Sequence, residues 1–129
     1  MKTKKGFTIL EISIVAIFSA LLLLFFFVQN SNINAMNRDE SRKIAINAMH
    51  YALEESFYAE NGYYPETISE ENIKVIDPAL WTDPSGITLG SEGCSYTYTP
   101  ADCKNGKCKE YTLKAILEKE SIYVKNNRN

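Results

Sequence analysis

The chain has 129 residues and a formal net charge of −2, which fits one small domain in addition to any membrane segment. Lys2, Lys4 and Lys5 precede a remainder with 11 basic and 16 acidic residues, so that residues 7–129 carry a charge of −5. This composition lacks the clustered basic residues of a nucleic-acid-binding protein. The chain has only one histidine and three cysteines, and this scarcity argues against a metal site or a nucleophilic catalyst.

Residues 7–28 form an apolar run in which Glu11 is the only charged residue. As a helix, these 22 residues span about 33 Å, which is enough to cross the hydrocarbon core of a membrane. The run is longer than the roughly 7 to 15 apolar residues of a secretory signal peptide. We therefore interpret it as a membrane span, with the N-terminal lysines in the cytoplasm and residues 29–129 outside.

The polar residues 29–37 contain no helix breaker and are expected to continue the helix, although a short flexible stalk is an alternative. Beyond them, apolar residues recur at spacings of three, four and four, which predicts an amphipathic helix over residues 38–60. The predicted buried stripe is Ile46, Met49, Leu53 and Phe57. The residues assigned mainly to the outer face are Asp39, Arg42, Lys43, Asn47, Glu54 and Glu55.

Asn61-Gly62 is a good C-terminal cap for this helix, and Pro65 prevents its continuation. Residues 66–93 form a linking region rich in turn signals, in which Trp81 is expected to be a buried anchor. We interpret the acids of this region as turn residues, because their spacing does not match a calcium-binding loop.

Three segments with strand character follow, at residues 95–99, 110–118 and 121–125. Their simplest arrangement is a small three-stranded antiparallel sheet packed on the second half of the long helix. The expected fold class is therefore α+β.

Cys103 and Cys108 flank the sequence KNGK, and an Asn-Gly turn at the centre of a hairpin brings such a pair together. Outside the cytoplasm the pair is expected to oxidise to a disulfide. Cys94 is then left as a buried thiol, as an alternative partner of Cys103, or as a link between subunits.

The stretch KKGFTILEISIVAIF, residues 4–18, resembles the class III signal of type IV pilins and the related type II secretion pseudopilins. In that family a prepilin peptidase cuts after the glycine of a short basic leader and methylates the new amine. The resemblance implies cleavage between Gly6 and Phe7 and N-methylation of Phe7. It makes Glu11 the fifth mature residue, which in the family meets the amine of a neighbouring subunit during assembly. An acid at membrane depth is costly and usually marks function.

The resemblance extends to Gly62-Tyr63-Tyr64-Pro65, since the first helix of the family commonly ends in Gly-x-Tyr-Pro. It implies a type IV pilin-like fold with four regions: a leader (1–6), a transmembrane half-helix (7–28), an amphipathic half-helix (29–61) and a small head (62–129). The chain departs from many pilins because no glycine or proline lies between Phe7 and Gly62. Its helix is therefore expected to unwind less readily.

The function implied by the resemblance is that of a structural subunit in a type IV pilus-like filament, without enzymatic activity or a cofactor. Its implied partners are further copies of the chain, the prepilin peptidase, an inner-membrane platform protein, an assembly ATPase and, before assembly, membrane lipid; no specific nucleic acid is implied. The implied location is the inner membrane and then an extracellular filament. Alternatives are a major pseudopilin of type II secretion or DNA uptake, and a single-span membrane-anchored binding module.

Overall fold

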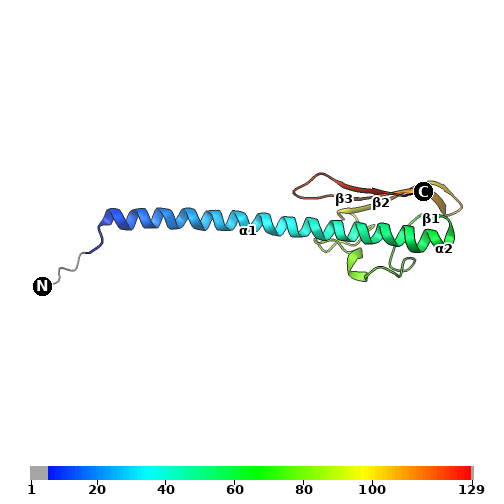
Figure 1. The fold of residues 1–129 in the computed structure, drawn as a ribbon, viewed down its shortest axis with the longest axis horizontal. Coiled ribbons are helices and arrows are strands. Elements are labelled where there is room, and N and C mark those ends of the chain that lie inside the picture. Colours follow the sequence, from blue (N-terminus) through cyan, green and yellow to red (C-terminus); the bar gives the residue numbers. More distant parts are fainter. Residues whose placement is uncertain (1–5, 129) are drawn as a thin grey trace. The chain divides into compact units, whose positions relative to one another are not determined.

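The computed structural model describes residues 6–128, so the lysines of the predicted leader and Asn129 lie outside the described residues. The chain divides into two compact units between Asn34 and Ala35, and helix α1 (Ile9–Ala52) supplies residues to both. In the second unit the helix packs on an antiparallel sheet (Figure 1), which confirms the expected α+β class. Residues 29–37 belong to α1, which confirms the expected continuation of the helix and excludes the alternative of a flexible stalk.

Two short helical elements follow α1 directly and complete the long helix. A π-helix, η1 (Leu53–Tyr58), is followed by α2 (Ala59–Asn61) and by Gly62. Gly62 has a φ of 72° and its N–H donates to the carbonyl of Tyr58 at 2.8 Å. This left-handed cap confirms the predicted helix end, because glycine adopts this conformation without steric cost.

The sheet has four strands, one more than expected. Strand β3 (Lys107–Ala115) is central, with β2 (Tyr96–Lys104) antiparallel on one side. On its other side β3 pairs with β1 (Tyr64–Pro65) at one end and with β4 (Tyr123–Asn126) at the other, both antiparallel. The additional strand, β1, has two residues, which is too short for alternation of polar and apolar residues to reveal it. A 3₁₀ turn, η2 (Pro78–Trp81), lies in the linking region.

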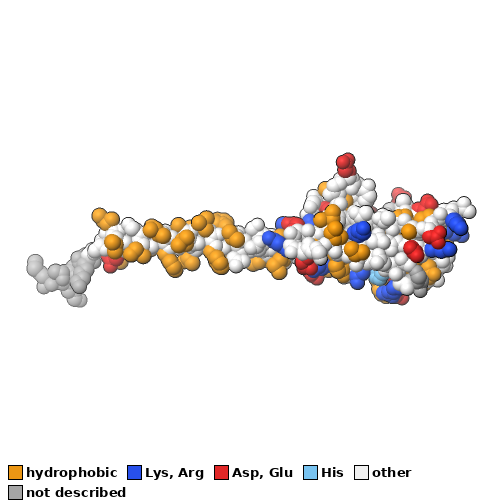
Figure 2. All heavy atoms as spheres, turned by 90° about the horizontal axis from the view of Figure 1, so that it is seen from above, with side chains coloured by type: hydrophobic (Ala, Val, Ile, Leu, Met, Phe, Trp, Pro, Cys, Tyr) orange, Lys and Arg blue, Asp and Glu red, His pale blue; other side chains and the backbone are white. Residues whose placement is uncertain are grey.

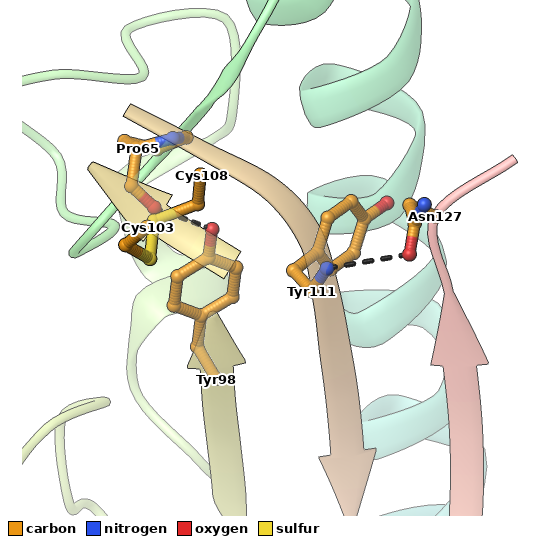
Figure 3. The surroundings of a disulfide bond; sticks show 6 residues. All are labelled: Pro65, Tyr98, Cys103, Cys108, Tyr111 and Asn127. Carbon is orange, nitrogen blue, oxygen red and sulfur yellow. Dashed lines mark hydrogen bonds between the residues drawn. A yellow bond between two sulfur atoms is a disulfide. The ribbon is translucent and has the colours of Figure 1, made fainter. Parts of the chain in front are cut away.

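The predicted disulfide joins Cys103 to Cys108, which are directly opposite each other in the register of β2 and β3 with Cα atoms 3.9 Å apart. Between them the hairpin turns at Asn105 and Gly106, whose φ angles of 52° and 78° are those of a two-residue turn with a left-handed backbone. Figure 3 shows Tyr98 beside the disulfide, with its hydroxyl donating to the carbonyl of Pro65 at 2.7 Å.

The core of the second unit lies between α1 and the inner face of the sheet. Ile46, Met49 and Leu53 are completely buried, as the spacing predicted, and Phe57 is half-buried against them. Burial of each such side chain stabilises the fold by about 1.5–3 kcal/mol. From the other elements the core receives Tyr64, Ile68, Ile73, Ile76, Trp81, Tyr96, Cys108, Tyr111, Leu113, Ala115 and Leu117.

Asp39 and Arg42, both assigned to the outer face from the sequence, are buried, and that assignment was wrong. Asp39 accepts hydrogen bonds at 2.8 Å from Arg42 and from the backbone N–H groups of Glu118 and Lys119. Arg42 also donates to Glu118 at 2.9 Å and to Ser95 at 3.2 Å. We call these five residues the Asp39 network. It binds the helix to the β3–β4 loop and to the start of β2.

Asp83 extends the Asp39 network into the linking region. Its carboxylate accepts from the N–H and the hydroxyl of Ser95, at 2.9 and 2.7 Å, and from the N–H groups of Ser85 and Ile87. Burial alone raises the pKa of Asp83, but these hydrogen bonds outweigh burial and leave the pKa below its ordinary value. Asp83 is thus the turn residue expected from the sequence and also a support for Ser95.

Glu54 is the third residue whose predicted exposure was wrong, and it anchors a second buried polar cluster. It accepts from the hydroxyls of Tyr64, at 3.1 Å, and Tyr111, at 2.8 Å, and from the N–H of Arg128. Since the Tyr111 hydroxyl gives its one proton to Glu54, His50 Nδ1, 2.7 Å away, must be the donor to that hydroxyl. Burial lowers the pKa of His50 and raises that of Tyr111.

We predict that Asp39→Ala destabilises the second unit by about 3 kcal/mol, because it leaves the Arg42 charge and two backbone N–H groups without their buried acceptor. Denaturant unfolding of the full chain in detergent measures this loss. Lys43→Ala is the matched control, since it removes an ion pair with Glu120 that is far more exposed. Equal losses of stability in the two variants would contradict the role assigned to Asp39.

Acid is predicted to weaken the attachment of the β3–β4 loop. Hydrogen bonds from Arg38 and Arg42 lower the pKa of Glu118 from 4.5 to about 2. The stabilising contribution of this carboxylate is therefore complete above pH 4.5 and is lost as the pH falls towards 2. The denaturant concentration at the unfolding midpoint should fall less steeply with decreasing pH for Glu118→Gln than for the unmodified chain. Identical dependences on pH in the two proteins would refute the prediction.

Candidate functional site

The candidate site is the start of α1, where the sequence predicts processing and assembly. Residues 6–8 are not helical, and the carbonyl of Thr8 accepts the first helical hydrogen bond, from the N–H of Ile12 at 3.2 Å. Thr8 is therefore the N-terminal cap of the helix. The peptide bond between Gly6 and Phe7 precedes this cap, in an exposed segment whose backbone is outside the helix.

Thr8 and Glu11 form a reciprocal capping box. Glu11 Oε2 accepts from the N–H of Thr8 at 2.8 Å and from its hydroxyl at 3.0 Å, and Thr8 Oγ1 accepts from the N–H of Glu11 at 3.3 Å. The pairing satisfies backbone donors that a helix start leaves without partners. The spacing Thr-x-x-Glu is a sequence signal for it, and Thr8 is the residue of this site that the sequence analysis did not single out.

The capping box uses only one oxygen of Glu11. All hydrogen bonds of this carboxylate within residues 6–128 fall on Oε2, so that Oε1 meets no donor in the described part of the chain. The first turn of a helix also favours a negative charge through the helix dipole. Glu11 is thus a carboxylate held in position by its own helix, with its second oxygen available to accept from further donors.

The rest of the first unit is suited to an apolar environment. The large apolar side chains from Leu10 to Val28 are 55–69% exposed, and hydrophobic side chains recur along the described part of this unit in Figure 2. Ser13 and Ser19 donate to the carbonyls four residues earlier, both at 2.8 Å, so their hydroxyls are satisfied inside the helix. Among the described residues, one helix is long and apolar enough to cross a membrane.

The cysteines lie in the second unit. Cys94 is free, because Cys103 pairs with Cys108, and this removes the alternative Cys94–Cys103 pairing. Its half-buried Sγ donates to the carbonyl of Ile87 and accepts from the N–H of Tyr96. Burial raises the pKa of the Cys94 thiol, which favours the protonated form.

Comparisons of this chain with protein-family models, with curated proteins and with solved structures find no match. The support for a function therefore comes from the residues and geometry of the chain itself.

Proposed function

We propose that the chain is a structural subunit of a type IV pilus-like filament, processed by a prepilin peptidase and assembled through its N-terminal helix. The observation that carries the proposal is Glu11: a carboxylate at the start of an exposed apolar helix, fixed by Thr8, with one oxygen available. A capped membrane anchor needs no acid there, because serine, threonine or asparagine alone caps a helix well.

Processing creates the group that Glu11 then binds. Hydrolysis of the Gly6–Phe7 peptide bond consumes one water and releases a carboxylate on Gly6 and an amine on Phe7. Methylation leaves this amine basic, so it keeps its positive charge near neutral pH. A charged amine and a carboxylate each carry a large desolvation cost in lipid, and pairing between neighbouring subunits offsets both.

The proposed partners follow from this geometry and from the resemblance. The apolar helices of further copies cover the exposed side chains of the first unit as lipid is replaced by protein. A platform protein and an assembly ATPase drive this transfer, and the second unit lies outside the membrane throughout. The Cys103–Cys108 disulfide suits that oxidising location.

The mature protein is predicted to begin at Phe7 and to carry one methyl group on its amine. Mass spectrometry of the N-terminal peptide from cells that contain the peptidase tests this directly. Recovery of an intact Met1 would contradict the proposed function and favour a plain membrane anchor. A chain cut near Ala35 would contradict both, because that cut removes the apolar segment at residues 7–28.

Glu11→Gln and Thr8→Ala separate assembly from capping. Glutamine still closes a capping box but carries no charge, so we expect at least about tenfold fewer filaments in cells with this variant as their only pilin. Thr8→Ala loses the cap at a cost of about 1 kcal/mol and keeps the charge, so filament numbers should stay near those of the unmodified chain.

Electron microscopy counts the filaments, and membrane fractions confirm that each variant is inserted. Normal filament numbers for Glu11→Gln would overturn the assembly role. An equal loss in both variants would show that the charge of Glu11 alone does not explain the effect.

A further inference from the structure

The chain contains two Asn-Gly pairs, Asn61-Gly62 and Asn105-Gly106, and both asparagines are exposed. At an Asn-Gly pair the backbone can react with the asparagine side chain. The nitrogen of the glycine, once it has lost its proton, attacks the side-chain amide carbon, and it is accessible because glycine has no side chain of its own. The outcome at each pair therefore depends on what holds these two groups in the folded chain.

Asn61-Gly62 is held by the cap at the end of the long helix. The N–H of Gly62 donates to the carbonyl of Tyr58 at 2.8 Å, and Nδ2 of Asn61 donates to the carbonyl of Phe57, also at 2.8 Å. Both reacting groups are thus bonded to the last turn of the helix. They can react only after these two hydrogen bonds break and the cap unwinds.

Asn105-Gly106 has neither restraint. The pair forms the tip of the β2–β3 hairpin, where the strand pairing ends at Lys104 and Lys107. Within residues 6–128, neither the side chain of Asn105 nor the N–H of Gly106 makes a hydrogen bond. A Cβ placed on Gly106 would meet no atom within 4 Å beyond its chain neighbours, so the space beside this glycine is open.

We propose that Asn105 is a site of self-catalysed deamidation, with water as the only co-reactant. The Gly106 nitrogen forms a bond to Cγ of Asn105, the bond from Cγ to Nδ2 breaks, and the side-chain nitrogen leaves as ammonia with the proton that Gly106 lost. The cyclic succinimide then takes up one water. Opening of the ring at Cγ gives aspartate, and opening at the backbone carbonyl carbon gives isoaspartate, in which the backbone runs through the former side chain.

The modification changes the charge of the hairpin tip and leaves the hairpin closed. A new carboxylate between Lys104 and Lys107 reduces the formal charge of residues 104–107 from +2 to +1. The Cys103–Cys108 disulfide and the pairing of β2 with β3 hold the two strands together on either side of the change. The site is thus a chemical mark that the chain acquires with age, and it does not depend on the proposed function.

Peptide mapping of the folded full-length chain in detergent tests the proposal. After incubation in mildly alkaline buffer and reduction of the disulfide, chymotrypsin cuts at the tyrosines that flank the two sites: Tyr58, Tyr63, Tyr98 and Tyr111. Mass spectrometry then measures the fraction of amide converted to acid in each peptide. We expect deamidation to be at least about tenfold faster at Asn105 than at Asn61, because two hydrogen bonds must break first at Asn61.

The unfolded chain separates the effect of structure from that of sequence. In denaturant with the disulfide reduced, we expect Asn61 and Asn105 to react at similar rates, since the helix cap is lost. Equal rates in the folded chain would overturn the proposal, and so would an Asn105 that stays intact there while it reacts in the unfolded chain. A difference that persists undiminished in the unfolded chain would assign it to sequence and contradict the protection argued for Asn61.

Asn105→Gln is the chemical control. Glutamine keeps the side-chain amide, but its additional methylene group slows ring closure. Ion-exchange chromatography of the aged, folded chain should therefore show much less of the more acidic form in this variant. The matched variant Asn61→Gln should leave the amount of that form unchanged. An undiminished acidic form in Asn105→Gln would show that the charge change arises elsewhere and would overturn the proposal.

Discussion

The buried pair of opposite charges formed by Asp39 and Arg42 is the interaction on which the arrangement of the second unit depends. A charge removed from water must be fully paired, since an incompletely paired one costs several kcal/mol. Asp39 meets this requirement through Arg42 and the backbone N–H groups at 118 and 119, and Arg42 through Glu118 and Ser95. These bonds hold the β3–β4 loop and the start of β2 against the helix.

The cluster around Glu54 has the same effect further along the helix. It joins η1 to β1, β3 and the backbone of Arg128. The apolar stripe of Ile46, Met49 and Leu53 lies between the two polar groups. Apolar contacts supply most of the stabilisation but tolerate sliding, whereas two hydrogen-bonded clusters separated along a helix define its register against the sheet. The π-helix lies at one of them, which agrees with the frequent placement of π-turns where side chains have special tasks.

The first unit follows a different physical rule, because its described large apolar side chains are exposed. The hydroxyls of Ser13 and Ser19 donate to carbonyls of the same helix, which suits a segment that spans lipid. Thr8 pairs with one oxygen of Glu11, whose second oxygen meets no donor among the described residues. In the proposed filament, Glu11 has two roles: one oxygen caps its own helix, and the charge of the carboxylate meets the amine of a neighbour.

The sequence by itself determined the features that depend on neighbouring residues: the long helix, its cap at Gly62, the Asn105-Gly106 turn and the pairing of Cys103 with Cys108. The Thr8–Glu11 box was equally open to prediction from its spacing. Tertiary structure alone decided that Asp39, Arg42 and Glu54 lie inside and that a two-residue strand joins the sheet. The partners of the buried charges lie up to 80 residues away, at Lys119 for Asp39. Helical periodicity records polarity along one helix and contains no information about a donor that only folding brings within hydrogen-bond distance.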